Sequence, residues 1–283
     1  MGKLKLLLLT SRPVFWSVYF FICLLGIVTS GIWNVNAFLS LFYVTMPLGI
    51  TIFSINDIAD RKSDINNPRK GGWQGNILKK SDIPFLLWSV SIITISFAVT
   101  FFLLNNFLAA ILILIVPLLA YAYSFKPLRL KGRPFLDSLI NAVGMLLVYL
   151  LGFSQKGQID IFKLPLIVWI IFLGFIAAHA LSTLADYEVD KNLDYNTTSV
   201  FLGRRLTAVY CAAILIILSL VVPFHLIILA YLLICIGFCL TLLGNPGKKF
   251  ILKGSWFLIF GFCLMSAYLF IFDYQFILKI TTN

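Results

Sequence analysis

Charged residues are scarce in this sequence. Only 12% of its 283 residues are Asp, Glu, Lys or Arg, whereas 61% are hydrophobic. Soluble domains carry about 25% charged residues, so this chain lacks the side chains needed to cover a water-exposed surface. We therefore expect the lipid bilayer to be the solvent around most of the protein, and we exclude the classes of protein that fold as soluble domains.

Cysteine and histidine are also few, with five and two residues respectively. All five cysteines lie within apolar runs, where a thiol behaves as a small hydrophobic group. Cys235 and Cys239 would share a helix face, but no histidine or carboxylate accompanies them, as a zinc site would require. The sequence therefore predicts neither a disulfide framework nor a zinc site, and we expect the cysteines to be packing residues.

Long apolar runs dominate what remains. Nine of them are long enough to cross about 30 Å of hydrocarbon as helices rising 1.5 Å per residue. They cover residues 14–33, 37–55, 83–104, 107–123, 135–153, 164–185, 206–222, 224–243 and 254–272. Breaks as short as Asn105-Asn106 predict tight antiparallel pairs, which satisfy their own backbone groups. The sequence thus predicts an all-α polytopic membrane protein with nine transmembrane helices, in a single domain over residues 1–283.

The basic residues indicate how this protein is oriented. The net charge of +11 could suggest a nucleic-acid partner, but the placement of the charges favours a membrane topology. With nine spans and the N-terminus inside, 19 of the 22 basic residues lie on one side, and only Lys156, Lys163 and Lys279 lie opposite. We therefore expect an integral, multi-pass protein of the cell membrane with its charged loops in the cytoplasm, and no nucleic-acid partner.

The acidic residues are more informative still. The chain has 11, and seven of them fall in two clusters, residues 56–64 and 186–194. We call these the first and second acidic motifs. Each follows the second helix of a predicted block of four, so the motifs mark equivalent places in two parallel four-helix halves, with one extra helix at the end. Both leave the membrane on the basic face, where nearly all of the candidate chemistry gathers.

The spacing within each motif favours a divalent cation. If the helices continue, the aspartates of each motif form one stripe, at i, i+3 and i+7 in the first and at i, i+4 and i+8 in the second. The candidate metal ligands are Asp57, Asp60, Asp64, Asp186, Asp190 and Asp194. Facing stripes would repel without counterions, and hard oxygen ligands at a membrane surface suit Mg²⁺. The alternative is two solvated helix ends, but two matching repeats at paired helices argue against it.

Basic residues near the motifs supply the other half of a diphosphate site. They are Arg61, Lys62, Arg69 and Lys70, then Lys126, Arg129, Lys131 and Arg133, and finally Lys191, Arg204 and Arg205. The positive-inside rule alone could equally explain the presence of any one of them. We favour Lys126, Arg129 and Arg133, because Tyr123 and Ser124 precede them as further donors. Together with Asn56 at the head of the first motif, these residues are the candidate diphosphate binders.

These residues carry a family resemblance. Asn56-Asp57-x-x-Asp60-x-x-x-Asp64, Tyr123-Ser124 and Asp186-x-x-x-Asp190 resemble the UbiA superfamily of intramembrane prenyltransferases. The resemblance implies nine helices around a lipid-open central cavity, and Mg²⁺ held by both motifs. It also implies a prenyl diphosphate donor that ionises and alkylates a hydrophobic acceptor. Because many members have glycine at the position of Asp194, we rank Asp57, Asp60, Asp186 and Asp190 above it as catalytic residues.

Further motifs narrow the resemblance to lycopene elongase-type enzymes. They are Ser11-Arg12-Pro13-x-Phe15-Trp16, residues 127–138 and His179-Ala180-x-Ser182. The implied acceptor is the end of a carotenoid, and an aromatic quinone precursor or a glycerol-type lipid is the alternative. His179 either lines the acceptor cavity or acts as a base, or it is a hydrogen-bonded interior residue. Arg12 either orients an acceptor head group or anchors its helix.

Two functions outside the enzyme class remain as alternatives. Two parallel halves with ionisable residues on paired helices would also describe an alternating-access transporter. The charges, however, lie at one membrane face and not near the midplane. A structural or lipid-scaffold protein would not account for paired acidic stripes.

Overall fold

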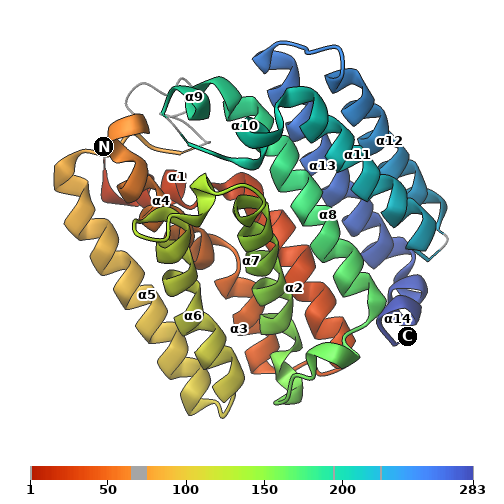
Figure 1. Ribbon diagram of the computed structural model, residues 1–283. Coiled ribbons are helices and arrows are strands. Elements are labelled where there is room, and N and C mark those ends of the chain that lie inside the picture. Colours follow the sequence, from red (N-terminus) through yellow and green to blue (C-terminus); the bar gives the residue numbers. More distant parts are fainter. Residues whose placement is uncertain (1, 65–74, 194, 224, 283) are drawn as a thin grey trace. The chain divides into compact units, whose positions relative to one another are not determined.

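The computed structural model describes residues 2–64, 75–193, 195–223 and 225–282, and these residues are helical nearly throughout (Figure 1). Within these described ranges, eight helical segments are long and apolar enough to cross a membrane, and α12 (Leu226–Leu242) is a shorter apolar helix of 17 residues. The all-α polytopic architecture is therefore confirmed. Nine spans around a central cavity stay a prediction.

The α-helices follow one another along the chain with short 3₁₀ turns between some of them. Their bounds are α1 Lys3–Thr10, α2 Trp16–Ser30, α3 Val35–Tyr43, α4 Met46–Asp64, α5 Ile83–Leu103, α6 Phe107–Ser124, α7 Leu136–Phe153, α8 Leu166–Thr183, α9 Tyr187–Asn192, α10 Thr198–Leu202, α11 Arg204–Val221, α12 Leu226–Leu242, α13 Lys248–Phe272 and α14 Tyr274–Thr282.

The predicted run over residues 37–55 is two helices, α3 and α4, which meet at Val44 and Thr45. Pro47 lies in the first turn of α4. A proline there has no N–H to donate to the preceding turn, so it favours a helix start over a continued helix. The helices α1 and α14 lie outside the nine predicted runs, and each is shorter than a membrane span.

The chain divides into two compact units. Unit 1 comprises Met1–Arg129 and Leu147–Ile161, and unit 2 comprises Leu130–Leu146 and Phe162–Asn283. This boundary lies near the one predicted between the two four-helix halves, except that the end of α7 belongs to unit 1. The single domain over residues 1–283 stays a prediction.

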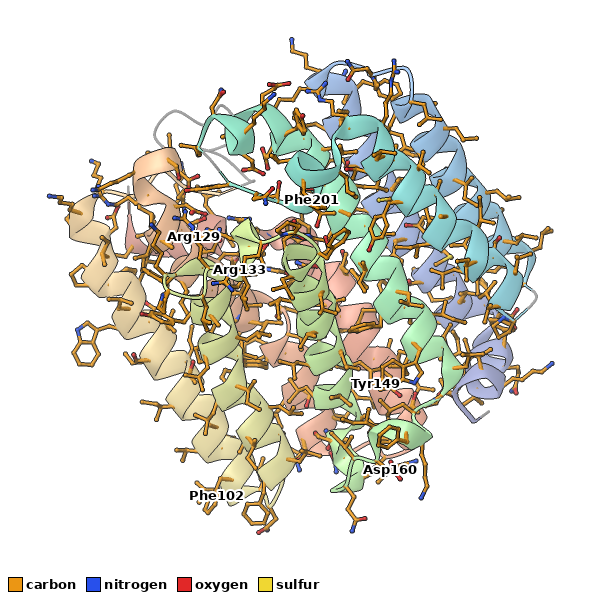
Figure 2. All side chains as sticks on the ribbon, viewed as in Figure 1. Phe102, Arg129, Arg133, Tyr149, Asp160 and Phe201 are labelled. Carbon is orange, nitrogen blue, oxygen red and sulfur yellow. The ribbon has the colours of Figure 1, made fainter. Side chains whose placement is uncertain are left out.

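In unit 1, α5 and α6 form the expected antiparallel pair across Asn105-Asn106 (Figure 1). Two glycines bring α2 against the end of α7. A Cβ on Gly26 would overlap the Tyr149 carbonyl oxygen, and one on Gly152 would overlap the Cys23 carbonyl oxygen. Small residues at such crossings let helix backbones touch, as is common in membranes. Figure 2 shows Arg129 at one end of this unit, with Phe102 and Asp160 at the other.

In unit 2, α8 packs against α11, α11 against α12, and α12 against α13. Hydrogen bonds join segments of the chain at both ends of this unit. At one end, Arg204 donates from Nη1 to Asn245 Oδ1 over 3.0 Å. At the other, His225 Nε2 lies 3.0 Å from Asp273 Oδ2. The second acidic motif therefore lies at the end where α8 stops and α11 begins.

Candidate active site

The first acidic motif continues the α4 helix, as predicted, until the helix ends at Asp64. Asp57 is fully buried at 0% exposure, Asp64 is buried, and Asp60 is partly buried. A carboxylate that is removed from water needs charge compensation or strong hydrogen bonds. The groups around these aspartates therefore decide what this helix end can bind.

Arg12 provides such compensation for Asp57. Its Nη2 donates to Asp57 Oδ1 over 2.7 Å, and its guanidinium carbon lies 4.1 Å from the centroid of the Phe53 ring. The sequence suggested that Arg12 would either orient an acceptor head group or anchor its helix. This ion pair was not predicted. The physical reason is that the chain turns back between α1 and α2, so residue 12 meets a residue 45 positions later.

A local backbone feature places Arg12. The residue has φ 48° and ψ 73°, in the left-handed region, just before Pro13. Ser11 lies directly against α4 at Gly49, where any Cβ would overlap the Ser11 carbonyl oxygen. Since glycine alone permits this approach, Gly49 sets how far the Arg12 side chain must reach to Asp57, which lies two turns further along α4.

The loop after α6 brings predicted diphosphate binders to the first motif. Ser124 donates from Oγ to Asn56 Oδ1 over 3.4 Å, and Arg129 Nη2 lies 3.8 Å from Asp60 Oδ1. Tyr123 is partly buried in the last turn of α6, and Lys126 is exposed just beyond it. Of the predicted set in unit 1, the structure therefore brings together Asn56 with Ser124 and Asp60 with Arg129.

The second acidic motif differs from the predicted continuous helix. α8 ends at Thr183, a 3₁₀ turn covers Leu184–Asp186, and the separate helix α9 begins at Tyr187. Asp186 is the N-cap of α9, with φ −105° and ψ 5°. The i, i+4, i+8 stripe is therefore wrong as one continuous helix face, because Asp186 precedes α9 and that helix ends at Asn192, before position 194. Asp194, like Arg69 and Lys70, lies outside the described residues.

Each described aspartate of the second motif has a polar neighbour within unit 2. Lys248 Nζ lies 4.0 Å from Asp186 Oδ1, and Thr197 donates from Oγ1 to Asp190 Oδ2 over 3.4 Å. Lys248 and Thr197 were not predicted as site residues, since neither belongs to a recognisable motif. Arg133 is exposed ahead of α7 in this unit.

The side chains around the motifs suit a Mg²⁺ ion that shares its ligands with a substrate better than they suit a metal ion held by the protein alone. In the described part of the chain, no three His, Cys, Asp or Glu side chains gather closely enough to hold a metal ion. Cations lie instead beside Asp57, Asp60 and Asp186. Mg²⁺ commonly binds through one or two carboxylates, with substrate phosphates and water completing the shell. Carboxylates with nearby cations would suit a metal–diphosphate pair of this kind.

Comparison with known proteins places the chain in a family. Residues 7–255 match the UbiA prenyltransferase family. A lycopene elongase/hydratase of Corynebacterium glutamicum is 32% identical over 207 residues, which is 72% of each chain.

Solved structures agree with this match. The chain is similar to a UbiA homolog from Archaeoglobus fulgidus bound to GPP and Mg²⁺, with a TM-score of 0.61, 20% identity and coverage of 94% and 98% of the two chains. A structure described for digeranylgeranylglyceryl phosphate synthase gives a TM-score of 0.62 at 21% identity, covering 94% and 99%. These two likenesses establish the fold. The resemblance inferred from the motifs is confirmed, and this integral, multi-pass membrane protein is a prenyltransferase that belongs to the UbiA family.

Proposed function

We propose that this enzyme transfers an isoprenyl group from an allylic prenyl diphosphate to a lipophilic acceptor in the membrane, and that it requires Mg²⁺. The observation that carries this proposal is the repetition of one arrangement. In each unit, aspartates stand where a long apolar helix ends, with a cationic side chain beside at least one of them. The Archaeoglobus fulgidus homolog, described as bound to GPP and Mg²⁺, supports the same donor and metal.

In this proposal, one group of residues holds the metal and another binds the diphosphate. Asp57, Asp60, Asp186 and Asp190 would hold the metal, with Asp64 and Asp194 as further ligands. Asn56, Tyr123, Ser124, Lys126, Arg129 and Arg133 would bind the diphosphate. Bound Mg²⁺ would supply charge neutralisation at the leaving diphosphate. Donors fixed in a water-poor site stabilise developing charge far better than water does, so the C–O bond to the diphosphate can break.

We propose a carotenoid such as lycopene as the acceptor. The Corynebacterium relative is named lycopene elongase/hydratase, which supports a polyene. The ion pair between Arg12 and Asp57 also supports a neutral acceptor, because that cation already has a carboxylate partner inside the protein. A glycerol-type lipid is the second candidate, favoured by the likeness to digeranylgeranylglyceryl phosphate synthase, and an aromatic quinone precursor is the third.

Product analysis tests this proposal. Membranes that contain the enzyme would be incubated with labelled dimethylallyl diphosphate and, in parallel, with lycopene, a glycerol-type lipid or an aromatic acid. We expect label in the lycopene product alone, loss of the reaction with EDTA and recovery with added Mg²⁺. Transfer to another acceptor would overturn the carotenoid proposal. Undiminished transfer in EDTA would overturn the metal requirement.

We also propose that the active site opens to the cytoplasm, because 19 of the 22 basic residues lie on that side in the nine-span arrangement. Single cysteines at Ser81 and Asn196, which are exposed near the first and second motif, are expected to react with an impermeant reagent from the cytoplasmic side. A cysteine at exposed Gln158 should react only from the other side. Labelling of Ser81 and Asn196 positions from opposite sides would contradict this topology.

A further inference from the structure

A buried carboxylate outside the acidic motifs organises part of unit 2. Asp137, at 1% exposure in the first turn of α7, accepts the backbone N–H of Ser138 at 2.7 Å and that of Thr198 at 2.8 Å. The Thr198 hydroxyl donates to the same carboxylate. Backbone N–H groups can only donate, so both Asp137 oxygens act as acceptors. The surroundings therefore stabilise Asp137 as a fixed acceptor.

Ser138 connects Asp137 to His179 through hydrogen bonds. Its Oγ lies 3.2 Å from Asp137 Oδ1 and 3.1 Å from His179 Nδ1, and a hydroxyl has one proton to donate. A hydrogen bond to a carboxylate is stronger than one to a neutral ring nitrogen. The proton therefore points to Asp137, and the Ser138 oxygen accepts from His179 Nδ1–H. In the neutral ring, the lone pair that can take up a proton is then on Nε2.

The network also connects to the second acidic motif within unit 2. His179 is partly buried on α8, seven residues before Asp186. The path from His179 to Asp186 covers the last turn of α8, at about 1.5 Å per residue, and a 3₁₀ turn, at about 2.0 Å per residue, so it is about 12 Å long. At the other end of the network, Thr197 donates to Asp190 Oδ2 over 3.4 Å, directly beside Thr198. His179 therefore lies deeper along the segment than the motif, on the side where the apolar part of a substrate would extend.

We propose that His179 accepts the proton that ends the transfer reaction. This inference rests on the proposed function. The C–O bond of the donor breaks and its electron pair leaves with the diphosphate. The π pair of an acceptor alkene forms the new C–C bond, which leaves the positive charge on the other alkene carbon.

That cation must lose its charge before the product can leave. It either releases a proton from the adjacent carbon to His179 Nε2, which forms a new C=C bond, or it captures water, whose proton passes to Nε2 and leaves an alcohol. Either ending needs a neutral histidine with its lone pair on Nε2. His179 would be the catalytic residue, and Ser138 and Asp137 would be positioning residues.

The kinetic test compares the prenylated product formed with the diphosphate released, using lycopene and labelled dimethylallyl diphosphate. His179→Asn keeps a side-chain N–H for the Ser138 oxygen but cannot accept a proton. We expect it to lower product per diphosphate released by about 10²-fold or more. Without the base the alkylation reverses, and water captures the donor cation to give prenyl alcohol and a proton released to water. Ser138→Ala should lower the ratio less. Ser219→Ala should leave it unchanged, because the Ser219 hydroxyl donates to the Ile216 carbonyl of its own helix at 2.7 Å.

A second measurement needs no substrate. The chain has two histidines, so ¹⁵N-histidine NMR of the His225→Gln variant reports His179 alone. We expect protonated Nδ1 and unprotonated Nε2, and loss of that preference in Ser138→Ala. Unprotonated Nδ1, or a wild-type product ratio in His179→Asn, would overturn this inference alone. If the wild-type enzyme fails to prenylate lycopene, that result overturns both the proposed acceptor and this inference.

Discussion

Asparagine in place of Asp57, Asp60, Asp186 or Asp190 is expected to reduce turnover by on the order of 10²- to 10³-fold in each case. The amide is similar in size but has no negative charge, so the variant loses a ligand for the proposed metal and the stabilisation of the leaving diphosphate that depends on it. Prenyl transfer at saturating Mg²⁺ and donor measures this effect.

Asp160→Asn is the matched control. Asp160 is exposed at the end of unit 1 opposite Arg129 (Figure 2), so the same change there should leave turnover within experimental error. Ligand binding can be checked without activity, because a ligand that binds only the folded state raises the stability of that state. Mg²⁺ with an unreactive diphosphate should stabilise the wild-type and Asp160→Asn proteins in detergent. Full activity in two of the four motif variants would refute this assignment of ligands.

Arg12→Ala is expected to destabilise the protein strongly, whichever acceptor the enzyme uses. The Asp57 side chain is fully buried and Arg12 is 15% exposed. Removing one partner of a buried ion pair typically costs about 3–5 kcal/mol, because the other charge stays in a poor solvent for it. Thermal unfolding in detergent, without metal or substrate, measures the loss. A fall in turnover in this variant therefore does not identify an anionic acceptor.

A double variant measures how much of this loss comes from the uncompensated charge of Asp57. Asp57→Asn removes the carboxylate that needs compensation, so Arg12→Ala with Asp57→Asn should be more stable than Arg12→Ala alone. Arg204→Ala provides the control, because Arg204 pairs at 3.2 Å with Glu188, whose side chain is 66% exposed. Exposed pairs contribute about 0–1 kcal/mol. Equal destabilisation by Arg12→Ala and Arg204→Ala, or no recovery in the double variant, would contradict the role given to Arg12.

Apolar length and charge spacing predicted much of this fold. The first motif continues its helix to Asp64 as the i, i+3, i+7 spacing implied, and the pairing of α5 with α6 follows from the two-residue break between them. The 3₁₀ turn before α9 was not predictable in the same way. The aspartates of the second motif fit a regular helix just as well, and nothing between residues 184 and 186 is a helix breaker.

Three of the site contacts that were not predicted join residues that are distant along the chain. Arg12 reaches Asp57, Lys248 reaches Asp186, and Asp137 binds Thr198. Local patterns report helix faces and caps, whereas these pairs depend on which helices become neighbours. A lone Asp137 at the start of an apolar helix gave one usable signal, since a buried carboxylate requires donors from somewhere.

The hydrogen bonds at the start of α6 bear on how the chain is assembled in the membrane. Asn106 caps α6 by accepting from the Ala109 N–H at 3.0 Å, and its amide nitrogen donates to Ser154 Oγ at 3.1 Å. During synthesis, α5 and α6 emerge well before residue 154 exists. The hairpin would first cross the bilayer with the Asn106 amide donating to water or lipid head groups. Its docking against the end of α7 would then be a later step, completed as Ser154 reaches the same membrane surface.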